Sequence, residues 1–397
     1  MKKIIYSFAA FCAALAFTAC SNDDDNNNST VNGSQEALDA ACAQWKVARA
    51  DWEWTEAFLF GAADEYSIDP HTDTWPVDQV TLASTLRDAT AMADLDKFIK
   101  TANSGILGYH GIEYVLFRDG KARDISQLTE LEYNYVCAVA KDLYYATCVL
   151  ATTWNSSVST SDARYKITTE YLASHNKLDD DGDVTGEGMS YTNFANEFKN
   201  PGSGKTYETA LDATLEIIAG AQDIISEVGD SKIGLPHTGE DKTYIESPYA
   251  YNSITDFYDN IISCRNALYG AMGVQTPQGN SLIRFCLSSN NTTLISQAEK
   301  VEDALETALS AIKNMKAPFA LYYADASAQT AMDALDALSG TLDDLSETLA
   351  KYSSNSEVQA QCQKINENYV DNIIYKSYNN LANDAEALYN AIVKIKK

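Results

Sequence analysis

The spacing of apolar residues constrains the fold of this chain more strongly than any other feature of its sequence. From residue 35 onward, apolar side chains recur every three or four positions, as at Leu38, Cys42, Trp45, Ala48 and Trp52. The same spacing returns near residues 294–315, 332–349 and 358–392. Residues three or four apart share one face of a helix, whereas a strand alternates its faces residue by residue. No stretch sustains such alternation, so we predict an all-α protein built from helical bundles.

A polar, turn-rich stretch from about residue 176 to residue 205 separates two helical parts of the chain. It contains KLDDDGDVTGEG and NPGSGK, which are dense in glycine, aspartate and other turn-forming residues. Before it we expect helices near residues 35–60, 78–101, 106–118, 126–155 and 161–174. After it we expect helices near residues 206–228, 251–272, 290–315, 326–351 and 356–395. Each part has enough amphipathic helix for a four-helix core, so we predict one bundle at residues 35–200 and another at residues 201–397.

The first 34 residues are expected to lie outside the bundles. Lys2 and Lys3 precede a short apolar stretch that ends in small residues, which is typical of a secretory signal peptide at residues 1–19. The sequence Phe-Thr-Ala-Cys at residues 17–20 resembles a lipobox and predicts lipidation of Cys20. Residues 20–34 are polar and low in complexity, as in a flexible tether. We therefore expect an outer-membrane lipoprotein of a Gram-negative bacterium, anchored through Cys20 and facing either the periplasm or the cell surface.

The charge balance limits the partners of the chain. It carries 29 Lys+Arg against 56 Asp+Glu, so its surface repels phosphate backbones and nucleic acid is not an expected partner. Such a surface tolerates or attracts cations, although an excess of negative charge more often serves solubility.

The cysteines do not indicate a metal or redox motif. None of the six after residue 20 forms a CxxC pair. Export would permit disulfides. Cys42, Cys264 and Cys362, however, fall at apolar positions of helical patterns, where cysteine behaves as a small hydrophobic residue. We expect mostly free, buried thiols.

One pair of polar residues interrupts the apolar run ILGYHGIEYVLF at residues 106–117. His110 and Glu113 are three apart, so on a helix both side chains point the same way. An imidazole and a carboxylate can ligate zinc, iron or copper. The glutamate could instead orient the imidazole as a general base, or the two could satisfy each other inside a helix interface. The HExxH motif is absent, which disfavours a conventional metalloprotease.

A second candidate for cation binding lies in the acidic loop DDDGDVTGE. Asp179, Asp181 and Asp183 have the spacing of calcium ligands. An EF-hand, however, needs glycine at its sixth position and glutamate at its twelfth, and this loop has glycine at the fourth and Ser190 at the twelfth. We interpret the loop as a solvated turn and do not expect calcium there.

Several motifs resemble those of one protein family. GYHGIE at residues 108–113 fits the GxHxxE signature of the imelysin family, bacterial envelope proteins linked to iron uptake and often labelled peptidases. Further similar stretches follow the family order: WEWTEAFLFGAA (52–63), DPHTDTWPVD (69–78), YNSITDFYDNIISCRNALYG (251–270) and APFA (317–320). The resemblance covers most of residues 35–397. It implies two four-helix bundles packed side by side, with the GxHxxE residues facing a groove between them.

The resemblance also implies which residues form the site. His110 and Glu113 would be its core, with Gly108 permitting a close approach or a kink at the start of the helix. Glu56 is the next candidate, because it lies at the margin of an apolar stripe, where a charge needs a partner. An exposed glutamate at the rim is an equally good interpretation.

Residues from the second half could complete the site. Ser253, Asp256 and Asn260 follow helical spacing on one face and could line the groove, or the first two could simply stabilise the start of their helix. Arg265 could pair with a carboxylate across the groove. His71 could approach it too, although a surface loop position is the simpler interpretation, and His175 and His237 are expected to be solvated.

These residues favour a binding protein over an enzyme. A catalytic zinc ion usually has three protein ligands, and only His110 and Glu113 are clearly supplied, so we assign no catalytic residue. We expect a protein that binds a ligand, iron or another divalent metal in the groove and works with iron-uptake components. The shell would be mainly carboxylate, which favours iron over structural zinc. The alternatives are a metal-dependent peptidase that uses the same site and a scaffold in which the pair is structural.

Overall fold

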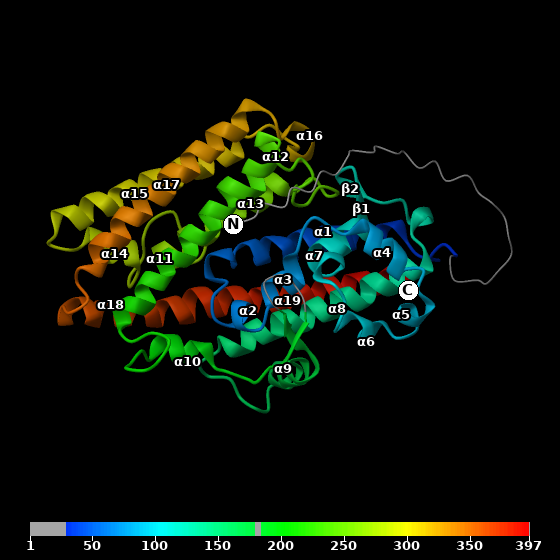
Figure 1. Cartoon of the computed structure of the whole chain (residues 1–397), viewed down its shortest axis with the longest axis horizontal. Coiled ribbons are helices and arrows are strands. Elements are labelled where there is room, and N and C mark those ends of the chain that lie inside the picture. The colour runs from blue at the N-terminus through cyan, green and yellow to red at the C-terminus, as the bar shows by residue number, and fades with distance from the viewer. Residues whose placement is uncertain (1–28, 179–183, 397) are drawn as a thin grey trace, which may run out of the picture.

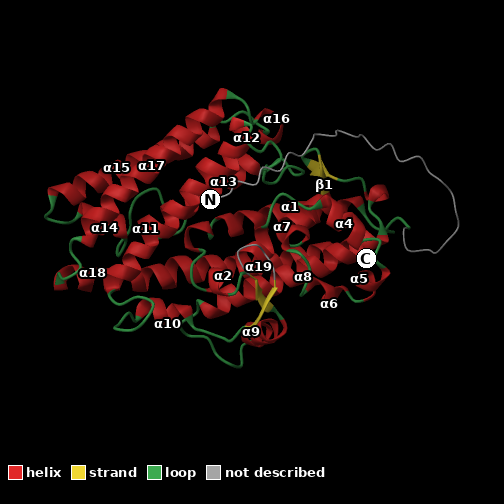
Figure 2. Ribbon diagram, viewed as in Figure 1, coloured by secondary structure: helices red, strands yellow, loops and turns green. Residues whose placement is uncertain are grey.

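The computed structural model of the protein describes residues 29–178 and 184–396 and is almost entirely helical (Figure 1). This confirms the predicted all-α fold class. Figure 2 shows how little strand the described part contains: β1 (Phe117–Arg118) pairs with β2 (Lys121–Ala122), and β3 (Asn176–Leu178) with β4 (Val184–Gly188). Cys20 and the loop residues Asp179, Asp181 and Asp183 lie outside the described residues.

Four helices pack around a first core. These are α1 (Gln35–Glu53), α7 (Gly108–Leu116), α8 (Glu130–Thr153) and α19 (Tyr375–Val393), each in contact with the next and the last with the first. The helix α9 (Ala163–Ser174) lies against the outside of α8. The apolar positions predicted for the first helix are all buried here, because Leu38, Trp45 and Trp52 point into this core.

Four other helices close a second core. They are α11 (Ala210–Ser226), α13 (Ser253–Tyr269), α15 (Thr292–Lys313) and α17 (Ala326–Ala350), again packed as a ring. The helix α18 (Ser356–Tyr369) covers α11 and α14 (Leu282–Leu287). The two cores meet where α1 packs on α13.

The last helix belongs to both groups. The helix α18 continues through the π-helical turn η5 (Val370–Ile374) into α19 without a break. In this continuous helix, α18 packs against the second group, whereas α19 lies between α1 and α8 of the first group (Figure 1). The predicted division into residues 35–200 and 201–397 therefore does not separate the two groups, because the first core needs α19. Periodicity predicts a helix but not its packing partner.

Short elements connect the long helices. They are η1 (Glu56–Phe58), α2 (Ala62–Glu65), α3 (Ile68–Asp73), α4 (Gln79–Thr85), α5 (Ala89–Ala93), α6 (Leu95–Ile99), η2 (Ser104–Ile106), η3 (Ile125–Gln127), α10 (Phe194–Lys199), the π-helical η4 (Glu227–Ile233), α12 (Gly234–Thr238), α16 (Phe319–Tyr322) and η6 (Lys394–Lys396). Among them η1 matters most for the site, because it packs against α11 and α13 of the second group.

Side-chain caps set several helix boundaries. Thr129 and Glu132 form a capping box at the start of α8, as Thr209 and Asp212 do for α11. Caps also explain why the single helix expected near residues 78–101 is wrong. Asp88 and Asp94 accept backbone N–H groups of the residues that follow them, which starts a new helix at each and gives α4, α5 and α6 instead.

The structure bears on the predicted free thiols and on possible membrane-spanning helices. All six cysteines of the described part are free, and only Cys137 is not fully buried, as expected. No helix of the described residues has both the length and the apolar character needed to cross a membrane.

The shared last helix predicts a non-local effect of a core substitution. Leu381→Ala in α19 should destabilise by about 2–5 kcal/mol and lower amide protection in α1 and α8, because Leu381 is buried in the first core. Leu342→Ala in α17 is the matched control and should lower protection in α11 and α15 instead. Hydrogen exchange followed by mass spectrometry measures both. Loss of protection from Leu381→Ala confined to α11–α17 would contradict this packing.

Candidate functional site

The predicted pair meets on α7 and is sealed from solvent. His110 Nδ1 lies 3.1 Å from Glu113 Oε2, and both side chains are buried. Glu113 Oε1 accepts the backbone N–H groups of Tyr249 and Ala250, each at 2.8 Å. Both oxygens of this carboxylate are therefore engaged, and they tie α7 to the segment that precedes α13 in the second half of the chain.

The other imidazole nitrogen faces an aspartate on α3. His110 Nε2 lies 3.2 Å from Asp73 Oδ1. Asp73 also pairs with Arg49 and accepts the indole N–H of Trp52 at 2.9 Å. Burial alone would lower the pKa of His110, but the carboxylates of Asp73 and Glu113 raise it to about 9. The imidazole is therefore protonated at neutral pH and cannot accept a proton as a general base.

A buried arginine holds the acidic groups together. The guanidinium of Arg49 is fully buried and pairs with Glu53, Asp73 and Glu246, the last at 2.7 Å. Burial would raise the pKa of Asp73, but Arg49 and His110 hold it well below its usual range. Asp256 Oδ1 lies 3.7 Å from the guanidinium. Carboxylates from both halves of the chain thus surround one cation.

A second buried cation comes from the π-helical segment η4. Lys232 Nζ lies 3.0 Å from Glu246 Oε1, 3.5 Å from Glu56 Oε2 and 3.5 Å from Glu227 Oε1. It also lies 5.0 Å from the centroid of the Trp75 ring. A π-helical turn widens the backbone locally and often occurs at functional sites. Here both Glu227 and Lys232 belong to that turn.

Three of the four candidates on α13 reach this network. Ser253 donates to the backbone oxygen of Glu246 at 2.5 Å, and Asn260 donates to Glu53. Asp256 faces Arg49, as described above. Arg265 does not join them. It pairs instead with Glu306 at 3.3 Å and Gln275 at 3.2 Å, farther along the second bundle.

Glu56 lies between two acidic pockets. One pocket of about 340 Å³ is lined by Glu56, Asp69, Pro70, Asp73, Thr74, Trp75, Glu227, Ser231 and Tyr244. The other, of about 310 Å³, is lined by Glu56, Leu59, Phe60, Asp64, Glu216, Gly220, Asp223, Ile224 and Glu227. None of the described residues that line either pocket is lysine, arginine or histidine. We call the first of these the acidic pocket.

The acidic pocket contains a group of carboxylates that could hold a metal ion. One oxygen each of Glu56, Asp69 and Asp73 lies within 4.8 Å of the others. Burial and the neighbouring Asp73 carboxylate raise the pKa of Asp69 to about 7, and burial raises that of Glu56 well above its usual range. Glu56 Oε1 is buried without a hydrogen-bond partner. A cation would neutralise this group and satisfy that oxygen.

A second possible set of ligands is already occupied by side-chain cations. Atoms of Asp73, His110 and Glu246 also lie within 4.8 Å of one another. Arg49 pairs with Asp73 and Glu246, and Lys232 pairs with Glu246. A metal ion there would have to displace both. Asp73 and Glu56 of the acidic pocket face the same two cations, so what distinguishes that pocket is the buried oxygen Glu56 Oε1, which has no hydrogen-bond partner.

Gly108 has a backbone reason to be glycine. Its φ of +60° lies in the left-handed region, and a Cβ atom there would overlap the backbone oxygen of Thr72. The start of α7 thus lies directly against α3. This close approach brings Asp73 on α3 to His110 on α7.

The remaining histidines lie elsewhere. His71 and His175 are both buried, so the surface position expected for the first and the solvated one expected for the second are wrong. Both contact Asp142 on α8, away from His110. His237 lies at the end of α12, with Nδ1 2.8 Å from the backbone oxygen of Tyr323.

Sequence reasoning missed the residues that connect the site. They are Arg49, Glu53, Asp69, Asp73, Glu227, Lys232 and Glu246. One signal was present, because Arg49 and Glu53 occupy the apolar face of α1, next to Trp45 and Trp52. Charges on a core-facing stripe require partners. Nothing in the sequence indicates which carboxylates those partners are.

The contact at Gly108 predicts a cost beyond backbone strain. Gly108→Ala should lower the free energy of unfolding by about 1–3 kcal/mol. The alanine would hold a strained positive φ, and its Cβ would also force α3 to move away. Gly204→Ala is the control, since its φ is +76° but no atom lies within 4 Å of its Cβ position. Equal losses in chemical denaturation would show that the approach of α3 is not tight.

The protonated His110 predicts a pH dependence. Its folded-state pKa of about 9 exceeds the ordinary histidine pKa of 6.5, so the stability that it contributes is complete below pH 6.5 and is lost as the pH rises through 9. The difference in unfolding free energy between wild type and His110→Gln should shrink by about 3 kcal/mol over that window. Urea unfolding from pH 6 to pH 10 measures it, and a constant difference would contradict the assignment.

Comparisons with known proteins agree with this architecture. A candidate iron-regulated protein A precursor from Parabacteroides distasonis has the same fold, with a TM-score of 0.62 over 80% of this chain and 85% of that one, at 23% identity. An imelysin peptidase from Bacteroides ovatus matches with a TM-score of 0.52 over 66% of each chain, at 29% identity.

Sequence comparisons give the family. Iron-regulated protein A of Synechococcus elongatus is 27% identical over 233 residues, which are 59% of this chain and 53% of the relative. This chain thus spans about half the length of that relative. The family model for imelysin matches residues 24–369, which is most of the chain. The resemblance in the motifs is therefore confirmed: the chain belongs to the imelysin family and is a homologue of iron-regulated protein A.

Proposed function

We propose that this protein binds a hard cation, ferric iron above others, in the acidic pocket, with Glu56, Asp69 and Asp73 as its ligands. One observation carries the proposal. Three carboxylates converge within 4.8 Å in an open pocket, and a buried oxygen of Glu56 there has no hydrogen-bond partner. Arg49 beside Asp73 and Lys232 beside Glu56 offset part of the repulsion among these carboxylates, and a proton or a bound cation would offset the rest.

The donor atoms of these three ligands indicate which kind of ion would bind. All three ligands offer oxygen, which suits hard cations rather than the softer ions that nitrogen and sulfur select. The side chain of Glu227 is 40% exposed and lines both the acidic pocket and the neighbouring cavity of about 310 Å³, so it extends the negative potential toward solvent. Among hard cations, iron is favoured because two of the similar proteins are named as iron-regulated.

The GxHxxE residues have a positioning role in this proposal. His110 and Arg49 keep Asp73 ionised, and Glu113 fixes the ring of His110 while joining the two halves of the chain. An ionised Asp73 is what a cation needs as a ligand. His110 and Glu113 therefore act through Asp73 and do not bind the ion themselves.

The alternative function, a metal-dependent peptidase, has less support. The comparison with the Bacteroides ovatus protein, named an imelysin peptidase, keeps it under consideration. Hydrolysis would need a base that can accept a proton from water. His110 is protonated, and both oxygens of Glu113 already accept hydrogen bonds.

The proposal also has a cellular setting. The lipobox-like sequence ending at Cys20 would anchor the protein to the outer membrane of a Gram-negative bacterium. The predicted tether is too long at its end, because Val31 is buried and its N–H donates to the backbone oxygen of Leu128 at 2.8 Å. The polar residues between Cys20 and this contact would hold the acidic pocket away from the lipid. From there it would pass its cation to iron-uptake components.

Iron loading tests the ligands directly. Wild type equilibrated with ferric citrate and then desalted should retain one equivalent of iron by elemental analysis. Glu56→Gln and Asp69→Asn should each weaken binding at least about tenfold, by analogy with losses at other metal sites. Glu36→Gln removes an exposed acidic residue of α1 and is the control, expected to behave as wild type.

Two results would decide against the proposal. A full equivalent of iron retained by the double variant Glu56→Gln/Asp69→Asn would place the ion elsewhere. Chelator-sensitive cleavage of casein that Glu113→Gln abolishes would support the peptidase instead.

A further inference from the structure

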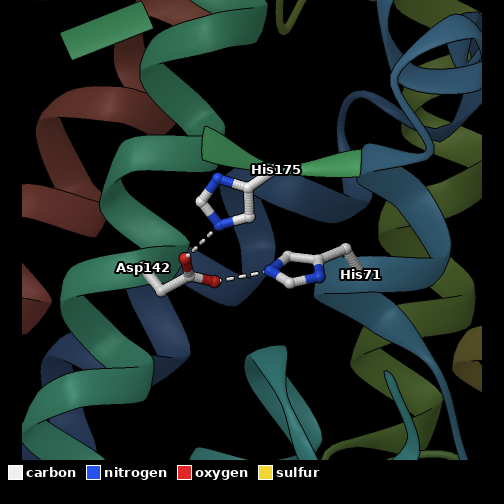
Figure 3. A group of neighbouring side chains, drawn as sticks. All are labelled: His71, Asp142 and His175. Atoms are coloured by element: carbon white, nitrogen blue, oxygen red, sulfur yellow. Dashed lines mark hydrogen bonds and ion pairs between the residues drawn. The ribbon is translucent and has the colours of Figure 1, made fainter. Parts of the chain in front are cut away.

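A second cluster of ligand-type side chains lies on the other side of α3. His71 Nε2 on α3 lies 2.5 Å from Asp142 Oδ2 on α8, and His175 Nε2, just after α9, lies 3.3 Å from Asp142 Oδ1. Figure 3 shows the two imidazole rings directed at the same carboxylate, each facing a different oxygen. One ligand atom from each of the three residues lies within 4.8 Å of the others.

The hydrogen bonds of His175 leave one of its nitrogens unsatisfied. Nδ1 lies 2.9 Å from the backbone oxygen of Tyr171, and a carbonyl oxygen can only accept, so Nδ1 carries the proton. In the neutral ring, Nε2 then presents a lone pair toward Asp142. This nitrogen is buried and has no hydrogen-bond partner. A lone pair facing a carboxylate oxygen is unfavourable unless a positive charge lies between them.

The geometry of His175 is the one that metal-binding histidines use. Such residues donate the second ring N–H to a carbonyl or carboxylate, which fixes the tautomer and aims the free nitrogen at the ion. The ring is also held by stacking on Tyr171, with centroids 3.7 Å apart and planes 12° from parallel. The free nitrogen is thus fixed in its orientation before any ion arrives.

Asp142 is available as an anionic ligand. Its Oδ2 lies 2.5 Å from His71 Nε2 and its Oδ1 lies 3.3 Å from His175 Nε2, so each oxygen is directed at one of the other two side chains. It stands on α8, in the interior of a long and well-packed helix. Two imidazoles and one carboxylate supply three ligands on three different elements.

A pocket gives access to the cluster. Asp142 and His175 line a cavity of about 410 Å³ together with Asp96, Ile99, Lys100, Ala138, Lys141, Tyr145, Glu170, Tyr171, Ala173 and Ser174. An ion held by the cluster would therefore have a coordination position open toward this cavity. Three protein ligands and an open position are the pattern of zinc and ferrous sites that bind a small exogenous ligand.

We propose that His71, Asp142 and His175 form a binding site for a divalent transition-metal ion, Zn²⁺ or Fe²⁺, with an open position toward the adjoining cavity. This site is separate from the acidic pocket, because it shares no residue with it and uses nitrogen as well as oxygen donors. On binding, the ion takes the place of the proton that His71 Nε2 donates to Asp142.

Titration with Co²⁺ and Zn²⁺ tests the site in the purified full chain. Wild type should bind one equivalent of Co²⁺ with visible d–d absorption, Zn²⁺ should displace it, and Zn²⁺ should raise the Tm. His175→Ala and Asp142→Asn should abolish that absorption. Asp142→Asn keeps the size and shape of the side chain and one acceptor oxygen while it removes the charge, so its fold, checked by circular dichroism, should be intact.

The matched control is His237→Ala. This histidine also points Nδ1 at a backbone carbonyl, but it belongs to none of the candidate metal groups of the described residues. His237→Ala and Glu56→Gln should both keep the Co²⁺ spectrum. No saturable binding by wild type would overturn the proposal. So would a spectrum that survives His175→Ala or disappears in Glu56→Gln, since the ion would then lie in the acidic pocket.

Discussion

The buried guanidinium of Arg49 is the contact on which the rest of the site depends. An arginine side chain cannot lose its proton inside a protein. Once α1 carries it into the contact between the two helix groups, carboxylates must come to it, because an unpaired buried charge is too costly. They come from its own helix, from α3 and from the segment before α13. One cation thus fixes three separate parts of the chain, and the ionised state of Asp73 follows from it.

Much of the fold could be predicted from the sequence, because a helix records its buried face in its own spacing. The long helices α8, α13, α15 and α17 lie close to where periodicity placed them. Two features could not be read in this way. Asp88 and Asp94 stop a helical pattern through local caps that the apolar spacing does not reveal. The partner of α19 depends on the packing of α1 and α8, which lie more than 200 residues earlier.

The site was predictable only in its local part. His110 and Glu113 are three residues apart, so their shared helix face follows from geometry, and Glu56 stood out as a charge beside apolar residues. Asp73, Lys232 and Glu246 became neighbours through tertiary packing, and no spacing in the sequence relates them. The same holds for His71 and His175, which looked like loop residues. They are more than 100 residues apart, and only the docking of α3 and α9 on α8 brings them to Asp142.

The continuous helix formed by α18, η5 and α19 limits how the two helix groups can move relative to each other. Many two-lobed receptors trap their cargo by swinging shut about flexible linkers. Here a continuous helix runs from the second helix group into the first, so closure of one group on the other would have to bend that helix. Under the proposed function, exchange of the cation would therefore depend on small rearrangements near the acidic pocket, such as rotation of the partly exposed Glu227 side chain. The extra backbone width of η5 is the natural place for the slight flexing that remains.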